Sequence, residues 1–339
     1  MSTFGPGAPD DSTWDKAVAA LAGAAQVSLA CHLSPDGDAL GSMLALAVAL
    51  HGRGIRVFPS FSEPLVVPAG LRALPGVELL VPSSAVPAAP ELLVTFDTGS
   101  RDRLGDLADR VGTAAEVLVI DHHVTNTAYG TLHLVDPTAA ATAVLVEELL
   151  RRLGVPLDAG IATCLYAGLV TDTGSFRYAA TTPATHLLAA RLLATGFRHD
   201  VLARELLDTH PFGWLGLLGA ALNRARLEAS ELDGLGLVWT ETRATELRGF
   251  GLDPDQSESL IDTIRTAREA EVAVVCKELP EGSWAVSVRS KGQIDVGAAC
   301  QTLGGGGHRF AAGFTSHTGL DATMAAMRSA LISAPRLPG

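Results

Sequence analysis

Four short runs of apolar residues, separated by segments of helical pattern, constrain the fold of this 339-residue chain more than any other feature. The runs at 26–33, 55–61, 91–96 and 116–120 are nearly unbroken, which is typical of strands buried on both faces of a parallel sheet. Helical patterns lie between and after them, at 38–50, 101–111, 140–153 and 158–171. This alternation predicts a doubly wound α/β domain with a parallel sheet.

A second, smaller set of elements follows residue 230. Strands are expected at 235–240, 272–279 and 284–289, and helices at 256–268 and 321–333. A glycine cluster lies between the last strand and the last helix. We therefore predict a catalytic α/β domain at 14–200, a helical connector at 201–230, and a smaller α/β domain at 231–335, with a cleft between the domains. Residues 1–13 are rich in Gly, Pro, Ser and Asp and are expected to form a disordered tail.

The charge of the chain excludes one class of partner. The formal net charge is −12, and a protein that grips long nucleic acid non-specifically needs a basic face. A nucleotide substrate would therefore be small, with its charge neutralised locally.

The four cysteines are far apart in the sequence, which indicates a reduced, cytoplasmic protein. The N-terminus lacks the features of a signal peptide, and the apolar stretch at 39–50 is shorter than the ~20 residues of a membrane span. We expect no membrane contact.

The first candidate site is the segment that follows the first predicted strand and opens a helix. It holds His32, Asp36 and Asp38, with Pro35 and Gly37 forming a tight turn between them. Ligands of open α/β sheets bind beyond the carboxyl ends of the strands. One aspartate there would most often be a helix cap, but three potential ligands within seven residues favour a binding site.

Three further candidates follow apolar segments. Asp97 ends the run at 91–96, and the triplet Asp121-His122-His123 follows the run at 116–120. Asp172 lies at the end of an apolar helical segment, where a carboxylate opposes the helix dipole and needs a compensating cation. Alone, Asp97 would be read as a cap.

The combined ligand set is carboxylate and imidazole, without cysteine. Such a set suits Mn²⁺ or Mg²⁺ better than structural zinc. Several aspartates in one pocket repel one another, and two divalent cations would relieve that repulsion. Two metals are a recurring arrangement for phosphoester hydrolysis, because they activate a water and clamp the phosphate.

These motifs resemble those of the DHH/DHHA1 phosphoesterase superfamily. The segment from His32 to Gly41 matches HxxPDGDxxG, the triplet at 121–123 matches Asp-His-His, and the segment from Gly304 to His308 matches the glycine-rich motif of a DHHA1 domain. All motifs occur in order over nearly the whole chain. The length and domain pair most resemble the branch that degrades very short oligoribonucleotides and dephosphorylates 3′-phosphoadenosine 5′-phosphate (pAp).

The resemblance implies roles for individual residues. One Mn²⁺, replaceable by Mg²⁺ or Co²⁺, would be held by His32, Asp36 and Asp97. A second would be held by Asp38, His122 and Asp172, with Asp97 bridging the two ions. Asp121 would orient His122 by accepting its other ring proton, and His123 would face the substrate phosphate.

Substrate-binding candidates lie mostly near the C-terminus. Gly305, Gly306 and Gly307 could turn their N–H groups inward as an anion nest beside His308, although glycine clusters are often plain reversals. Arg289 is the candidate for a second phosphate anchor, because a guanidinium grips phosphate bidentately.

Some weaker candidates lie in the N-terminal domain. Arg101 could also reach the phosphate, whereas we assign Arg103 to a solvated helix face. Phe176 and Tyr178 could stack a base, although aromatic residues at such positions usually belong to the core.

The sequence therefore predicts a metal-dependent phosphoesterase acting on dinucleotides, other short RNAs and pAp, with a homodimer as a family expectation. Two alternatives remain open. One is a signalling phosphodiesterase for cyclic di-AMP, which needs the same catalytic site. The other is a nucleotide sensor without hydrolysis, against which the complete set of metal ligands argues.

Overall fold

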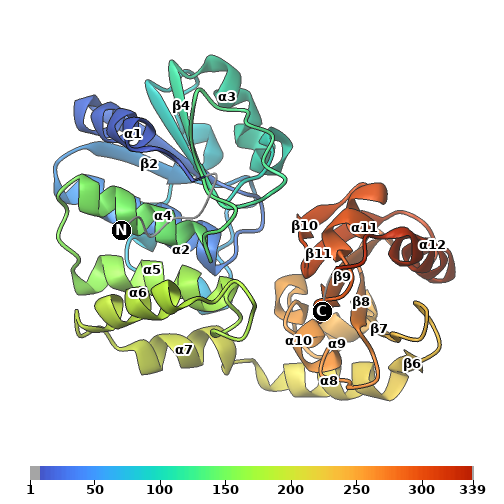
Figure 1. The fold of residues 1–339 in the computed structure, drawn as a ribbon. Coiled ribbons are helices and arrows are strands. Elements are labelled where there is room, and N and C mark those ends of the chain that lie inside the picture. Colours follow the sequence, from blue (N-terminus) through green and yellow to red (C-terminus); the bar gives the residue numbers. More distant parts are fainter. Residues whose placement is uncertain (1–7, 338–339) are drawn as a thin grey trace. The chain divides into compact units, whose positions relative to one another are not determined.

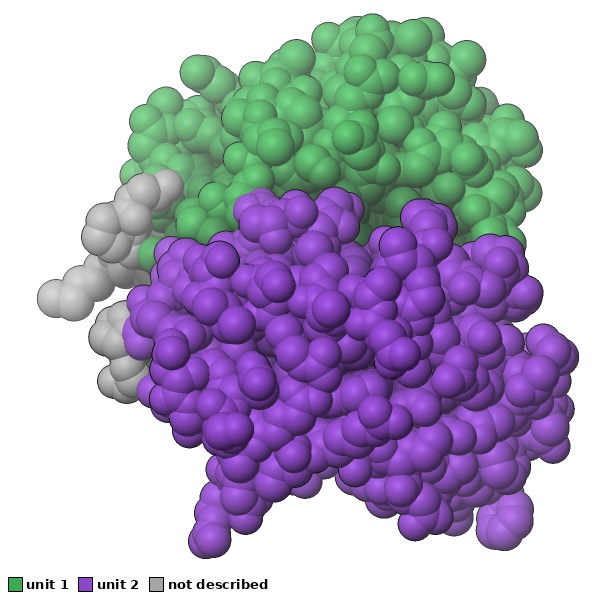
Figure 2. Space-filling view, turned by 90° about the vertical axis from the view of Figure 1, so that its right-hand side faces the viewer, with its two compact units in different colours: residues 1–209 green, residues 210–339 purple. Residues whose placement is uncertain are grey.

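The computed structural model describes residues 8–337 and divides into two compact units, Met1–Thr209 and His210–Gly339 (Figure 2). The division falls within the segment expected to be the connector: helix α7 (His199–Leu207) belongs to unit 1 and helix α8 (Phe212–Arg224) to unit 2. Most of the expected tail lies outside the described residues. Asp10 caps helix α1 (Asp11–Gly23), which therefore begins inside the expected tail.

Unit 1 is built on a parallel sheet with strand order β2-β1-β3-β4-β5. Figure 1 labels two of its strands, β2 and β4. The strands are β1 (Gln26–Cys31), β2 (Arg56–Ser60), β3 (Leu92–Phe96), β4 (Glu116–Asp121) and β5 (Leu132–Val135). The sequence predicted the first four. It missed β5, because this short edge strand alternates buried and half-buried residues and carries no continuous apolar run.

Helices cover both faces of this sheet, as expected for a doubly wound fold. One face packs against α1, α2 (Gly37–Gly52), α4 (Thr142–Arg152) and α5 (Ala159–Asp172), and α6 (Pro183–Leu193) and α7 pack on α5. The other face packs against a 3-10 helix, η4 (Arg101–Leu107), and α3 (Ala108–Thr113). The predicted single helix at 101–111 is thus two pieces, because Gly105 has a left-handed φ of 54°. Three short 3-10 helices lie between β2 and β3: η1 (Ala69–Leu71), η2 (Val77–Leu79) and η3 (Ser83–Ala85).

Glycines allow α2 and α5 to pack closely. A Cβ added to Gly41 of α2 would lie 2.4 Å from the carbonyl oxygen of Cys164 in α5, and one added to Gly168 of α5 would lie 2.6 Å from Asp38 Oδ1. The close approach brings the start of α2, which carries Asp38, against the end of α5, which carries Asp172. The glycine of the first motif therefore has a packing role.

Unit 2 contains a six-stranded mixed sheet of order β10-β11-β9-β8-β7-β6. Its strands are β6 (Arg226–Glu228), β7 (Leu237–Thr242), β8 (Val272–Glu278), β9 (Trp284–Ser290), β10 (Gly306–His308) and β11 (Ala311–Ser316). Only β7 and β8 pair in parallel. The sequence predicted β7, β8 and β9, whereas β6, β10 and β11 are too short or too rich in glycine and alanine to predict.

The two faces of the second sheet differ in how they are covered. Helices α11 (Val296–Thr302) and α12 (Leu320–Ser333) bury one face. On the other face, α8 and α10 (Leu260–Ile264) cover the part near β7 and β8. The predicted helix at 256–268 is only α10 preceded by a 3-10 turn, η5 (Pro254–Ser257); α9 (Ala244–Gly249) lies upstream.

Among the described residues, no helix is both long and apolar enough to cross a bilayer. The four cysteines are buried free thiols.

We predict that Gly41→Ala lowers the free energy of unfolding by about 2 kcal/mol, because the added methyl group overpacks a rigid backbone contact. Gly52→Ala is the matched control in the same helix, since a Cβ there meets nothing within 4 Å. It should leave stability unchanged or raise it slightly. Urea denaturation followed by circular dichroism measures both, and equal effects of the two changes would contradict the packing role of Gly41.

Candidate metal centre and phosphate-binding face

The candidate metal centre lies at the carboxyl edge of the parallel sheet, between β1 and β3. With strand order 2-1-3-4-5, the connections leave these two strands in opposite directions, and this is where open α/β sheets bind ligands. His32 follows β1 and Asp97 follows β3. Asp97 has a left-handed φ of 53°, a conformation that aspartate tolerates and that is enriched at functional sites.

One cluster forms around His32. Its Nδ1 hydrogen bonds to the carbonyl oxygen of Leu33 at 2.8 Å, so Nε2 points to the carboxylates. Nε2 lies 3.6 Å from Asp97 Oδ2 and 3.9 Å from Asp36 Oδ1. Asp36 also caps α2, so the cap interpretation of this residue is confirmed, and the same carboxylate lies close enough to His32 to be a metal ligand.

The neighbouring cluster forms around His122, which follows β4. Its Nδ1 hydrogen bonds to the carbonyl oxygen of Ala139 at 3.1 Å, which again directs Nε2 to the carboxylates. Nε2 lies 3.1 Å from Asp172 Oδ2, 3.4 Å from Asp97 Oδ1 and 3.9 Å from Asp38 Oδ2. The two oxygens of Asp97 thus face different histidines, which is the geometry of a bridging ligand.

The N-terminus of α4 holds the carboxylates in place. Asp38 accepts hydrogen bonds from the backbone N–H groups of Thr142 and Ala143, at 2.6 and 2.9 Å. The Thr142 hydroxyl donates to Asp97 Oδ1 at 3.0 Å. The helix dipole at this end favours negative charge. Thr142 is a functional residue that the sequence analysis missed, because it lies in an alanine-rich stretch without any charged residue.

The crowding of buried carboxylates shifts their acidity. Burial and the neighbouring charge of Asp97 raise the pKa of Asp38 to about 7. Burial also raises the pKa of Asp172 well above its usual value, against the opposing effect of His122. Burial acts to raise the pKa of Asp97 as well, but hydrogen bonds from His122 and His32 outweigh it and place that pKa well below the usual value. Without a cation the site must therefore take up protons.

These residues fit divalent metal ions. The ligand atoms of His32, Asp36 and Asp97 lie within 4.8 Å of one another, and so do those of Asp38, Asp97 and His122. The donors are carboxylate oxygens and imidazole nitrogens, which Mn²⁺ and Mg²⁺ accept. In each histidine the second ring nitrogen bonds a carbonyl group, which is the usual way a metal-ligating imidazole is oriented.

The prediction that Asp121 accepts the other ring proton of His122 was wrong. Asp121 does not contact His122 Nδ1, which bonds Ala139; it accepts a hydrogen bond from His123 Nδ1 at 2.7 Å. Its other oxygen accepts a bond from the Asn126 side chain at 2.5 Å. Burial lowers the pKa of His123, but the bond to Asp121 and the charge of Asp97 outweigh burial, so the pKa lies above its usual value.

Both arginines after Asp97 are exposed, as expected for Arg103. Arg101 bonds the carbonyl oxygen of Ala108 and the Asp109 carboxylate at 3.1 Å, so its guanidinium is held within its own helical segment. Arg103, which we assigned to solvent, places its guanidinium 3.3 Å from His32 Nδ1.

The expectation of a stacking platform after Asp172 is not supported for Phe176. Its ring stacks on His186 with centroids 5.0 Å apart and packs against the core of unit 1. The chain reaches this position through left-handed conformations at Gly174, Ser175 and Phe176, which no sequence pattern indicated.

In unit 2, the register places His308 and Arg289 on one face of the sheet. His308 lies opposite Ala311, and Ala311 lies opposite Arg289 on the next strand, so the three form a cross-strand row. Arg289 is half-buried, in the alternating pattern of β9. This row offers two hydrogen-bond donors suited to an anion.

The glycine segment differs from the expected nest. The N–H groups of Gly304 and Gly305 bond the carbonyls of Gln301 and Cys300 and so end α11. Gly306 and Gly307 belong to strand β10, paired with β11. A Cβ at Gly307 would collide with Ala311 and Ala312, so glycine is needed there for close strand pairing. The segment therefore presents His308 on a sheet face and not a ring of inward N–H groups.

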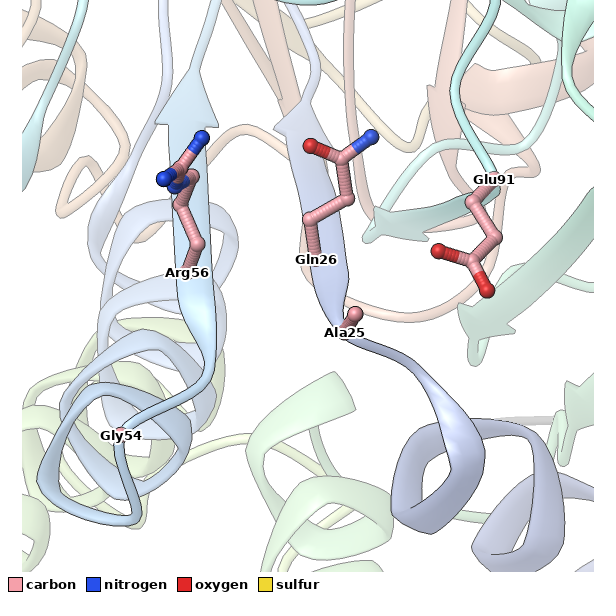
Figure 3. Close-up of a pocket in the computed structure, with 5 residues that line it drawn as sticks. All are labelled: Ala25, Gln26, Gly54, Arg56 and Glu91. Carbon is pink, nitrogen blue, oxygen red and sulfur yellow. The ribbon is translucent and has the colours of Figure 1, made fainter.

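A hollow of about 470 Å³ lies elsewhere in unit 1 (Figure 3). Its lining residues are at or before the starts of β1, β2 and β3: Ala25, Gln26, Gly54, Arg56 and Glu91. This is the amino edge of the sheet, opposite the metal-ligand clusters. It brings together no carboxylate–imidazole set, so the clusters and not the hollow define the candidate site.

A buried carboxylate–imidazole centre that can hold divalent ions at the carboxyl edge of a parallel sheet suits phosphoester hydrolysis. The chain belongs to the DHH family: the model of the DHH family N-terminal domain matches residues 26–169, and that of the DHHA1 domain matches residues 241–333.

Curated relatives agree with this assignment. The chain is 36% identical over 316 residues to the bifunctional oligoribonuclease and PAP phosphatase NrnA of Thermus thermophilus, covering 91% of this chain and 90% of that protein. It is 28% identical over 293 residues to the cyclic-di-AMP phosphodiesterase GdpP of Geobacillus thermodenitrificans, covering 82% of this chain but 42% of that protein.

A solved structure shares the fold. An exopolyphosphatase-related protein from Bacteroides fragilis matches with a TM-score of 0.84 at 21% identity, covering 95% of this chain and 96% of that one.

We predict that Asp97→Asn removes Mn²⁺ binding at both clusters, because each cluster uses a different oxygen of this carboxylate. Asp36→Asn should weaken only the cluster of His32, since asparagine still caps α2. Calorimetric titration with Mn²⁺ distinguishes loss of all binding from loss of one component. Unaltered titration of the Asp97→Asn variant would exclude the bridging role.

Proposed function

We propose that this protein is a Mn²⁺-dependent phosphoesterase that hydrolyses short oligoribonucleotides to mononucleotides and pAp to AMP. The observation that carries the proposal is the position of Asp97, whose two carboxylate oxygens face His32 and His122. The name of the Thermus relative, which matches nearly full length, supports the substrate class.

The ligand set assigns roles to the residues of unit 1. His32, Asp36 and Asp97 would hold one ion, and Asp38, His122 and Asp172 the other, with Asp97 shared. Bound there, two divalent ions would supply a hydroxide at neutral pH and neutralise charge on the phosphate. Thr142 and the N-terminus of α4 fix the carboxylates, so their positions do not depend on the substrate.

His123 is the proton donor in this proposal. Asp121 holds its Nδ1 proton, which fixes the orientation of the ring, and the raised pKa favours an imidazolium that can protonate a leaving oxygen from Nε2. Arg103, beside His32, adds a positive charge at the rim of the same site.

Unit 2 would bind a substrate phosphate through Arg289 and His308, which share one sheet face. A local cationic row in a chain of net charge −12 suits a substrate with few phosphates better than a long strand.

A second candidate function is cyclic-di-AMP hydrolysis, favoured by the similarity to GdpP over 82% of this chain. It requires the same catalytic residues, so a comparison of substrates must decide.

Turnover of pAp, pApA, a ten-residue RNA and cyclic di-AMP with Mn²⁺ tests both functions. The proposal expects fast release of product from pAp and pApA and little from the ten-residue RNA. Dominant turnover of cyclic di-AMP would assign the second function. No turnover of any of the four, with tight nucleotide binding, would contradict an enzymatic role and indicate a sensor.

We predict that Asp121→Asn lowers kcat for pApA by about 100-fold, because His123 loses the negative charge that raises its pKa, and general acid–base catalysis is worth about 10² to 10⁴ in rate. Mn²⁺ binding should be retained, since Asp121 bonds neither His32 nor His122. The control is Asn126→Ala, which leaves both partners of the bond between Asp121 and His123 in place and adds no charge beside them. Equal losses of activity and metal in the Asp121 variant would contradict a positioning role.

A further inference from the structure

Beside Arg289, the half-buried face of β9 carries a second polar group. Strand β9 alternates buried and half-buried residues, which places Ser287 on the same face as Arg289. The two are roughly 7 Å apart along the strand, given a rise of about 3.3 Å per residue. Ser287 lies opposite Gly313 of β11, and Gly313 lies opposite Gly306 of β10. On the β11 and β10 side of Ser287, this neighbouring row therefore has no side chains.

Space above the sheet is found at Gly306, the outer glycine of this row, whereas a Cβ on Gly313 would lie 2.7 Å from the Val286 carbonyl oxygen. A Cβ added to Gly306 meets no atom within 4 Å. Helix α10 packs on the same face mainly at β7 and β8, through Ile261 and Ile264, and its edge reaches β9. A flat group or a sugar can therefore lie on the sheet between the phosphate-binding row and the edge of α10.

A fixed carboxylate stands at this edge. Glu258, between η5 and α10, forms an ion pair with Lys277 of β8 and accepts a hydrogen bond from Ser287 Oγ at 3.3 Å. Lys277 also donates to Ser287 Oγ at 2.9 Å. The Lys277 side chain is 6% exposed, whereas that of Glu258 is 61% exposed. The buried Lys277 thus anchors the Glu258 carboxylate on its protein side, and the exposed side of Glu258 remains open to a ligand.

The ion pair with Lys277 determines which ligand groups Glu258 can bind. Lys277 neutralises the charge, so the carboxylate repels a phosphate on Arg289 less than a lone acid would. Each carboxylate oxygen has more than one acceptor position, and only one per oxygen is used within the protein. The remaining positions accept hydrogen bonds from hydroxyl or amino groups. A carboxylate beside a phosphate site is a known means of binding ribose hydroxyls.

We propose that Glu258, fixed by Lys277 and Ser287, is a specificity residue that accepts hydrogen bonds from the nucleoside whose phosphate binds Arg289. This rests on the proposed function and deepens it, because it names the ribonucleoside as the recognised group. The donor is a ribose hydroxyl or a base amino group. Both present the same hydrogen-bond chemistry to a carboxylate.

The test uses Glu258→Ala in the full-length protein with Mn²⁺. Removal of this exposed side chain opens Lys277 to water, so the fold should persist, and a thermal melt checks it. Asp255→Ala is the matched control, an equal charge change at an exposed residue of the same segment. KM and kcat are measured for pApA, for its 2′-deoxy counterpart, and for the dinucleotide with purine riboside in place of adenosine.

We expect Glu258→Ala to raise KM for pApA about tenfold, the effect of losing a hydrogen bond to a charged acceptor, with kcat unchanged. For the analogue that lacks the recognised donor, KM should be the same in Glu258→Ala and in the unaltered protein. An unchanged KM for the 2′-deoxy compound assigns the donor to the ribose, and an unchanged KM for the purine riboside compound assigns it to the base. Asp255→Ala should change neither. If Glu258→Ala leaves the ratios of KM among the three substrates as in the unaltered protein, the proposal is overturned.

Calorimetric binding of the same three compounds in EDTA separates this outcome from failure of the proposed function. A protein that does not hydrolyse pApA contradicts the phosphoesterase proposal. If Glu258→Ala nevertheless abolishes, in EDTA, the tighter binding of pApA over the analogue that lacks the recognised donor, the role of Glu258 is still supported. Binding of all three compounds that is equal in the variant and the unaltered protein contradicts it.

Discussion

Three aspartates packed at one edge of a parallel sheet are the constraint on which the rest of unit 1 depends. Asp38 and Asp97 are almost fully buried, and Asp172 is largely so. Buried like charges are costly unless hydrogen bonds, protonation or cations compensate them. The structure supplies part of that compensation through the N-terminus of α4 and through His32 and His122.

Packing brings these charges together from distant parts of the chain. Glycines at positions 41 and 168 let α2 and α5 approach closely, so that the start of one helix meets the end of the other. Carbonyl groups of Leu33 and Ala139 hold the two imidazoles by Nδ1 and turn Nε2 inward. A site built in this way is set before a ligand arrives, which is what fast chemistry on a small phosphoester requires.

Most strands of unit 1 and the convergence of its candidate ligands could be predicted from the sequence, because buried parallel strands are continuous apolar runs and the acids follow directly after them. The partner of Asp121 could not. The two adjacent histidines point in different directions after the strand. Only the backbone path shows that His123 Nδ1 hydrogen bonds to Asp121, whereas His122 Nδ1 hydrogen bonds to the carbonyl group of Ala139. The approach of the exposed Arg103 guanidinium to His32 Nδ1 at 3.3 Å likewise joins residues 71 positions apart and has no sequence signal.

Unit 2 was harder to predict for a different reason. Its glycine segment reads equally as a loop or an anion nest, and only strand pairing shows that Gly307 is there to allow close contact with β11. The same pairing places His308, Arg289 and Ser287 on one face, and the contact from Glu258 could not be inferred because the residue lies about 30 positions upstream in a polar turn.

The most direct measurement is anomalous diffraction from crystals grown with Mn²⁺. Two peaks are expected, one on either side of the Asp97 carboxylate and about 3.5–4 Å apart, the first beside His32 and the second beside His122. A single peak, or peaks remote from Asp97, would contradict a shared carboxylate as the centre of the site.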